Sequence, residues 1–217
     1  MSAPVTPESA VADLLGLVAL GELLAFERLA ADARFAPDLR RRAALGEMAA
    51  AEIANYRRLA DRLEVLGVPV EEAMAAYVAP LQGYHDSTEP RDWVEAVTKA
   101  YVGDGITDDF LREAAEALRE PDRQLVLDVL HESRYAEFAA AEIRHAVAAD
   151  PKVAGRLSMW ARRLVGEALS QAGRVVTADQ GALTTLIVAD GRTDVPGLFR
   201  RLTAAHTARM AAAGLNN

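Results

Sequence analysis

The sequence predicts an all-α protein built as a bundle of long helices, and two observations carry that prediction. Ala, Leu, Arg and Glu, which form helices readily, dominate the 217 residues, whereas alternating stretches of Val, Ile and Thr are nearly absent. Pro and Gly interrupt the chain at only a few places, so the segments between them are long. Hydrophobic residues make up 51% of the chain and charged residues 26%, as in a globular protein with its own core.

The first two predicted helices form a hairpin. The first helix is expected over residues 7–32, with Thr6 as its cap and a proline at its first position. The second is expected over residues 38–66 and should end at Gly67, since glycine readily takes the backbone conformation that closes a helix.

A long connection over residues 68–89 follows the first hairpin. We expect a short helix at 71–77 and a turn at 80–83 within it, because Pro80 and Gly83 are turn residues. A second hairpin should then form from helices over about 90–118 and 122–149.

Further helices are expected after the second hairpin, over about 151–178 and 196–210. Two helix hairpins joined by a long crossover have the connectivity of a ferritin-like helical bundle. A plain linker between two separate hairpins is the alternative. We therefore predict a single ferritin-like domain over 1–217, with a core bundle over about 7–149 and additional helices over about 151–213.

The two predicted hairpins resemble each other at their middles. Gly21-Glu22 in the first helix recurs as Gly103-Asp104 in the third, and Glu52 in the second matches Glu132 in the fourth. When the apolar stripe of each helix is traced in steps of three and four residues, a carboxylate falls near its middle.

Four carboxylates at matching heights would meet inside one bundle. Buried carboxylates are rare unless they are paired, and mutual repulsion drives them towards protonation. A bound cation is the simplest remedy. The alternatives are that each carboxylate reaches water at the edge of its stripe, or that Arg58, Arg134 or Arg162 pairs with them. The candidate metal ligands are Glu22, Glu52, Asp104 and Glu132, with Asn55, Tyr135 and Asp108 as further candidates.

Several stretches of the sequence resemble a known family over about residues 11–176. The stretches are Gly21-Glu22-Leu23 and the residues 99–104, 127–130 and 162–168. Together they make the chain similar to ferritin-like proteins of high-GC bacteria that are classed with the tRNA 2-methylthio-isopentenyladenosine hydroxylase. The resemblance implies a di-iron centre that activates dioxygen and hydroxylates a C–H bond.

The chain departs from that family pattern at two positions. The resemblance implies the four carboxylates as iron ligands together with two histidines, but the histidine positions hold Asn55 and Tyr135. Imidazole suits iron, whereas amide and carboxylate oxygens suit harder ions, and a tyrosine near its ordinary pKa is a costly ligand. His131 cannot replace position 135, since it points about 100° round the helix from Glu132.

Two functions therefore stay open. One is an oxygen-dependent hydroxylase with iron or another divalent cation, whose catalytic residues beyond the metal ligands the sequence does not identify. The other is a catalytically inactive ferritin-like scaffold or interaction protein, either metal-free or holding one structural cation. His85, His145 and His206 are expected to be surface or structural residues.

Composition limits the partners and the compartment. The net charge of −8 disfavours tRNA, which only the resemblance implies as substrate. The absence of cysteine excludes disulfides and thiolate sites and fits a reducing cytoplasm. The first nine residues lack the basic region of a signal peptide, and the apolar run over 11–20 is interrupted by Asp13 and is shorter than a membrane span. We expect a cytoplasmic protein with no membrane contact, and a homodimer is a candidate assembly.

Overall fold

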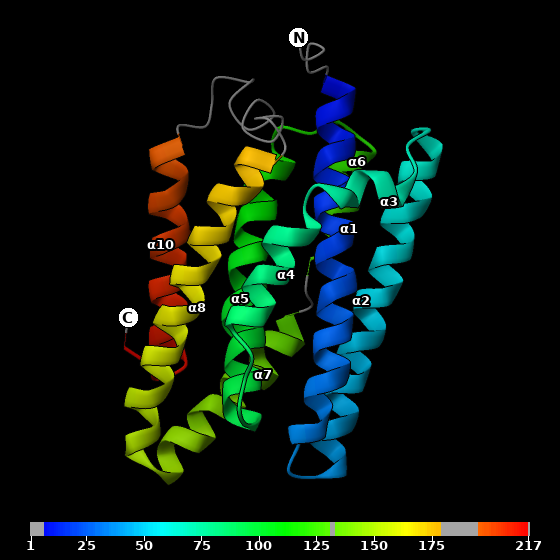
Figure 1. The fold of residues 1–217 in the computed structure, drawn as a ribbon. Coiled ribbons are helices and arrows are strands. Elements are labelled where there is room, and N and C mark those ends of the chain that lie inside the picture. The colour runs from blue at the N-terminus through cyan, green and yellow to red at the C-terminus, as the bar shows by residue number, and fades with distance from the viewer. Residues whose placement is uncertain (1–6, 131–132, 179–194, 217) are drawn as a thin grey trace.

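The computed structural model describes residues 7–130, 133–178 and 195–216, and these residues are helical almost throughout (Figure 1). This confirms the predicted fold class. The elements in chain order are α1 (Pro7–Asp32), the 3-10 helix η1 (Ala33–Phe35), α2 (Leu39–Val65), α3 (Val70–Ala75), α4 (Val78–Ser87), α5 (Trp93–Ala115), α6 (Asp122–Asp128), α7 (Ser133–Ala149), α8 (Pro151–Ala178) and α10 (Val195–Ala212).

The predicted first hairpin is formed by α1 and α2, which lie side by side along their full length (Figure 1). Asp38 caps α2, because its carboxylate accepts a hydrogen bond from the Arg41 backbone N–H at 2.8 Å. The helix ends where Gly67 takes a positive φ of 74°, as the sequence predicted. The predicted cap Thr6 lies outside the described residues.

The crossover is more helical than the sequence predicted. The prediction of a turn at residues 80–83 is wrong, because these residues lie in the first half of α4. Pro80 is tolerated there since it lies in the first turn of the helix, where its missing N–H has no partner to lose. The short helix α3 packs closely on α1, with Ala73 facing Gly16.

The fourth predicted helix is not continuous. The sequence predicted one helix over 122–149, but α6 ends at Asp128 and α7 begins at Ser133. Val129 has φ −91° and ψ 0°, outside the helical range. No proline or glycine marks this break, so the apolar periodicity continues across it and hides it from sequence reasoning.

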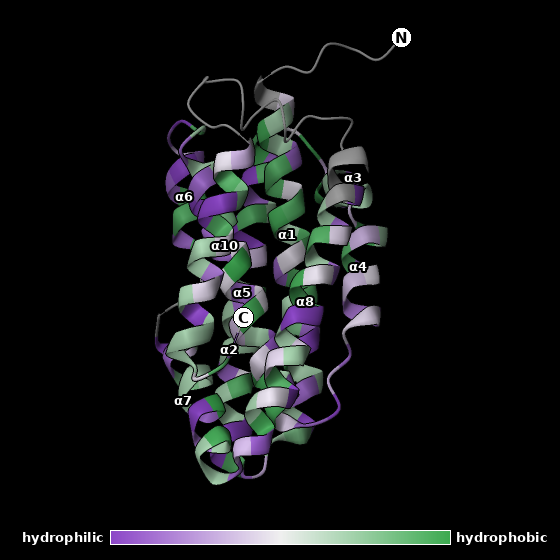
Figure 2. Cartoon of the chain, turned by 90° about the vertical axis from the view of Figure 1, so that its left-hand side faces the viewer, coloured by the Kyte–Doolittle hydropathy of each residue, from purple (hydrophilic) through white to green (hydrophobic). Residues whose placement is uncertain are grey.

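Two apolar clusters fill the two ends of the bundle. The first joins the N-terminal half of α1 to the C-terminal halves of α2 and α5, with Leu15, Leu59 and Leu111 as members. The second joins the opposite ends of these helices to α7, α8 and α10, with Leu29 and Leu157 as members. Figure 2 shows apolar positions on α1 and on the helices around it, with polar positions between them.

Helix α1 is long and apolar enough to cross a membrane by length and composition alone, over the stretch Ser9–Phe35. This apolar stretch is longer than the apolar run over residues 11–20, because the helix stays largely apolar beyond Leu20. In the structure, half of its most apolar window is buried, and the helix packs on α2 and α3. A core helix of a bundle passes the same test of length and composition, since it is apolar on most of its faces.

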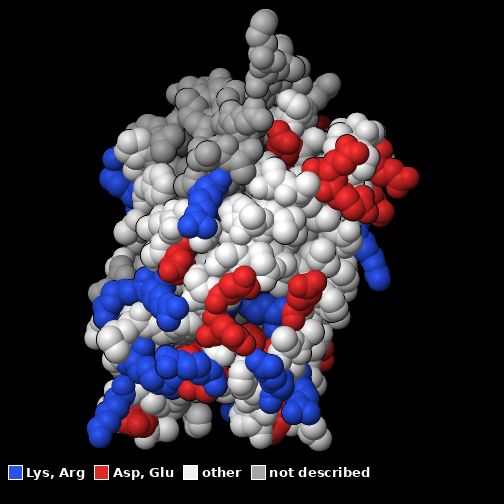
Figure 3. All heavy atoms as spheres, in the orientation of Figure 1, with Lys and Arg blue, Asp and Glu red and all other residues white. Residues whose placement is uncertain are grey.

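The molecular face drawn in Figure 3 carries both signs of charge. Basic and acidic side chains lie intermixed over its lower half, and acidic side chains gather near α3, which contains Glu71 and Glu72. The face therefore has no continuous basic surface of the kind that follows a phosphate backbone.

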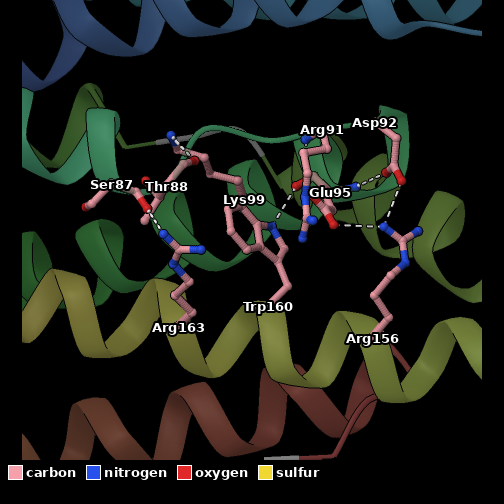
Figure 4. A network of polar contacts seen from close by, with 9 residues as sticks. All are labelled: Ser87, Thr88, Arg91, Asp92, Glu95, Lys99, Arg156, Trp160 and Arg163. Carbon is pink, nitrogen blue, oxygen red and sulfur yellow. Dashed lines mark hydrogen bonds and ion pairs between the residues drawn. The ribbon is translucent and has the colours of Figure 1, made fainter.

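Polar contacts fix α8 to the start of α5 and to the segment before it (Figure 4). Trp160 donates its indole N–H to the Glu95 carbonyl at 3.1 Å, and Arg156 donates to the Glu95 carboxylate at 2.8 Å. Arg163 donates to the Ser87 carbonyl at 2.6 Å. The additional C-terminal helix is thus held to the crossover and the core bundle by directed hydrogen bonds as well as by apolar packing.

Candidate functional site

Charged side chains occupy the middle of the bundle, between the two apolar clusters. On α1, Glu22 follows Leu20 of the first cluster and precedes Leu29 of the second. On α2, Glu52 lies in the same way between Ala49 and Leu59. Both carboxylates are buried. The apolar stripe traced on each helix predicted that Glu22 and Glu52 lie in the interior, and the structure places both there, on neighbouring helices.

Asn55 acts as a hydrogen-bond donor in this interior. Its side-chain Nδ2 donates to Glu22 Oε2 at 3.2 Å and to the Val129 carbonyl at 3.2 Å. It thereby ties α1 and α2 to the residue that follows α6. These two bonds orient the amide of Asn55 with its N–H groups, rather than its oxygen, towards Glu22.

Asp104 forms an ion pair with an arginine of α1. Arg28 Nη2 donates to Asp104 Oδ1 at 3.1 Å, and the two side chains are only 9% and 16% exposed. Burial by itself would lower the pKa of the Arg28 guanidinium, but the adjacent Asp104 carboxylate holds that pKa above its ordinary value. A cation of the protein therefore faces the third predicted ligand.

Further ionisable groups adjoin this pair, and we call Arg28, Asp32, Tyr84, Lys99 and Asp104 the interior charge cluster. A Cβ placed on Gly103 would lie 3.5 Å from the Tyr84 hydroxyl and 3.8 Å from Arg28 Nη1, so both side chains lie over this glycine. Burial raises the pKa of Tyr84 to about 12, although Arg28 acts in the opposite direction. Burial also raises the pKa of Asp32 despite the nearby Arg28 and Lys99.

Lys99 is the most enclosed cation of the cluster. It is buried, and its Nζ donates to the Thr88 carbonyl at 2.8 Å (Figure 4). The Nζ also lies 5.5 Å from the centre of the Tyr84 ring. Burial, together with the like charge of Arg28, lowers the pKa of Lys99 to about 7. Burial of its own side chain lowers the pKa of His85 to about 3, so this histidine is neutral at physiological pH.

We expect Lys99 to make stability depend on pH. Its pKa returns from about 7 to 10.5 on unfolding, so the unfolded state binds more protons between these values and the free energy of unfolding rises with pH there. Chemical denaturation should show this rise for the wild type and a flatter profile for Lys99→Met. Lys152→Met, at an exposed position, is the control and should keep the wild-type slope. Equal slopes for all three proteins would contradict the prediction.

Asp104, Asp108 and Tyr135 line one cavity of about 240 Å³. Asp108 is buried and pairs with Arg112 at 3.7 Å. The Tyr135 hydroxyl accepts a hydrogen bond from Arg134 at 2.9 Å. The predicted site residues thus fall into two groups, since Glu22, Glu52 and Asn55 do not line this cavity.

The described donor set does not fit a di-iron centre. Asp104 faces the Arg28 guanidinium, and Asn55 offers N–H groups to Glu22. Within residues 7–130, 133–178 and 195–216, no group of three or more His, Asp or Glu side chains is arranged to hold a metal. The predicted ligand Glu132 and its neighbour His131 lie outside the described residues.

Sequence reasoning missed Arg28, Tyr84 and Lys99. A signal for Lys99 was present, because it is the lone charge in the apolar run over 96–102. Arg28 and Asp32 are spaced by four residues on α1 and so share one helical face. Tyr84 gave no signal, because it lies in a segment that was predicted to follow a turn.

Comparisons with known proteins agree with this fold. A family model described as the ferritin-like domain of actinomycetes matches residues 6–190. A solved structure titled as protein 19 with aldehyde deformylating oxidase activity, from Synechococcus, is similar with a TM-score of 0.76 and 15% sequence identity, over 97% of this chain and 92% of that chain. At that identity the likeness carries the fold alone. No curated protein matches the sequence.

Proposed function

The chain belongs to the ferritin-like domain family of actinomycetes, and on that premise we propose that it is a divergent member of the hydroxylase-like group that lacks a di-iron centre. An arginine of the chain balances the interior carboxylate Asp104, and the protein acts as a ferritin-like scaffold or interaction protein. We also propose that the protein is cytoplasmic and forms a homodimer. Both parts of the proposal rest on the composition of the chain and not on observed contacts.

The Arg28–Asp104 ion pair is the observation that carries the proposal. A buried carboxylate needs a compensating charge, and here a guanidinium at 3.1 Å supplies it. A metal ion at Asp104 would have to displace this guanidinium or share its carboxylate with it, and like charges held close together in a buried site repel each other strongly. The donor role of Asn55 towards Glu22 supports the same conclusion.

An oxygen-dependent di-iron hydroxylase is the second candidate. In its favour, Glu22 and Glu52 are buried on neighbouring helices, where the family resemblance implies ligands. Modification of tRNA is the least favoured form of this candidate, since the net charge is −8 and the face in Figure 3 mixes both signs of charge.

Metal content separates the candidates. We expect elemental analysis, after anaerobic loading with ferrous iron, to find well under one iron per chain in the wild type. The triple variant Arg28→Gln/Asn55→His/Tyr135→His removes the guanidinium and restores the donors that the family resemblance implies, and it should bind more iron than the wild type.

A wild type that binds about two iron per chain, the stoichiometry of a di-iron centre, would overturn the proposal if Glu52→Gln lowered that content. A single bound Mg²⁺, Ca²⁺ or Mn²⁺ would instead support the scaffold with a structural cation, because hard ions take carboxylate oxygens. Circular dichroism of each variant confirms that the helical fold is kept.

A further inference from the structure

Helix α10 lies at the edge of the bundle and packs chiefly on α5 (Figure 1). Near its C-terminus, single hydrogen bonds tie it to two other helices. Arg144 of α7 donates to the Ala212 carbonyl at 3.1 Å, and the uncharged Ser158 hydroxyl of α8 accepts from the Asn216 backbone N–H at 3.0 Å. The packing on α5 is therefore the main contact that keeps α10 docked.

A histidine stands in the buried stripe that α10 turns towards the bundle. Leu198, His206, Met210 and Ala213 are all buried, and their spacing places them on one face of the helix. His206 is only 4% exposed. A polar imidazole thus occupies a position where the apolar pattern of the helix calls for a hydrophobic side chain.

Neither ring nitrogen of His206 has a hydrogen-bond partner among the described residues, and both nitrogens are shielded from water. A neutral imidazole carries one donor and one acceptor, and burying them unpaired costs free energy. Water, and with it a proton, reaches these nitrogens once α10 moves away from α5. Protonation of His206 is therefore coupled to the release of the helix.

The charges around His206 do not favour an imidazolium in the docked state. Arg209 follows one turn later on α10, and Asp109 of α5 accepts hydrogen bonds from both Arg209 and Arg112, the second at 3.2 Å. Arg144 of α7 adds a further cation at the last turn of α10. Burial, together with Arg209, lowers the pKa of His206 below 6.5, although Asp109 acts in the opposite direction. An added proton would meet a carboxylate that two guanidinium groups already share.

A second ion pair between α10 and α5 withstands mild acid. Arg201 donates to the two Glu113 carboxylate oxygens at 2.7 and 2.6 Å, and this bonding lowers the pKa of Glu113 below its ordinary 4.5. The pair therefore stays ionised at pH 5. Histidine is the side chain that ordinarily changes charge between about pH 5 and 8, so His206 is the group of this interface suited to respond to mild acid.

We propose that α10 is an acid-released helix, in which protonation of His206 undocks α10 from α5 and uncovers its buried stripe. Release also opens the cavity, because Arg209 of α10 is part of its lining. The undocked form binds the proton and the docked form does not, so docking is favoured above pH 6.5 and weakens as the pH falls below it. This device goes beyond the proposed function and operates whether or not the bundle holds a metal.

Hydrogen–deuterium exchange of the full chain, read by mass spectrometry and corrected for the intrinsic exchange rate at each pH, tests the proposal. In the wild type, the protection of the α10 amides should fall about tenfold between pH 7 and pH 5, since each pH unit below the pKa of the undocked histidine shifts docking by up to about tenfold. His206→Leu and His206→Gln cannot take up the proton, so α10 should keep its protection at pH 5 in both variants.

Two references separate release of α10 from general acid damage. The amides of α2 report on the whole fold, which acid also weakens through the buried His85, so α10 should lose more protection than α2 does. His145→Gln, at an exposed position of α7, is the matched control and should behave as the wild type does. The proposal is overturned if α10 of the wild type keeps its protection at pH 5, if α2 loses as much protection as α10, or if both His206 variants lose as much as the wild type.

Discussion

Arg28→Met is expected to lower the free energy of unfolding by about 3–5 kcal/mol, because it removes the cation of a buried ion pair and leaves a buried negative charge. The Arg28 and Asp104 side chains are only 9% and 16% exposed, so water replaces the lost partner incompletely. Denaturation by guanidinium chloride, followed by circular dichroism, measures the effect. The double variant Arg28→Met/Asp104→Leu should recover most of the loss, since an apolar pair of similar size needs no charge balance.

The matched control is an arginine in an exposed pair. Arg58 and Asp128 form an ion pair at 2.7 Å with side chains 44% and 42% exposed, so Arg58→Met should cost no more than about 1 kcal/mol. If Arg28→Met were as mild as Arg58→Met, Arg28 would not be the cation that balances the bundle interior, and the proposed function would lose its main support.

Gly16→Ala is expected to lower stability by about 3 kcal/mol, which is the upper range for overpacking a core. A Cβ at this position would overlap the backbone carbonyl of Ala73, where α3 crosses α1. Backbone atoms cannot rotate away as a side-chain tip can, so α3 would have to move. Thermal and chemical denaturation both measure the change.

Gly21→Ala on the same helix is the control for Gly16→Ala. A Cβ on Gly21 meets nothing within 4 Å, so the substitution should raise stability by about 0.5–1 kcal/mol through the better helix propensity of alanine. A gain in stability at both positions would show that α3 does not pack on α1 as closely as described.

Local sequence signals were enough for most helix limits. Helix α8 starts at Pro151, and α2 ends at Val65, two residues before Gly67, because proline and glycine act on the backbone of their own few residues. The signal failed for α5. A start between Ser87 and Pro90 was expected, but Asp92 caps the helix by accepting a hydrogen bond from the Glu95 N–H at 2.9 Å.

The helical fold class, the order of hairpin, crossover and hairpin, and the interior position of Glu22 and Glu52 could all be predicted from local patterns, because they follow from helix propensity and from the 3.6-residue period. The charges that the interior carboxylates meet depend instead on tertiary contacts. Arg28 and Asp104 lie 76 residues apart in the chain, and Arg209 and Asp109 lie 100 apart. Helical periodicity states which face of a helix is buried but not which side chain of another helix lies opposite, because that depends on how the helices pack together.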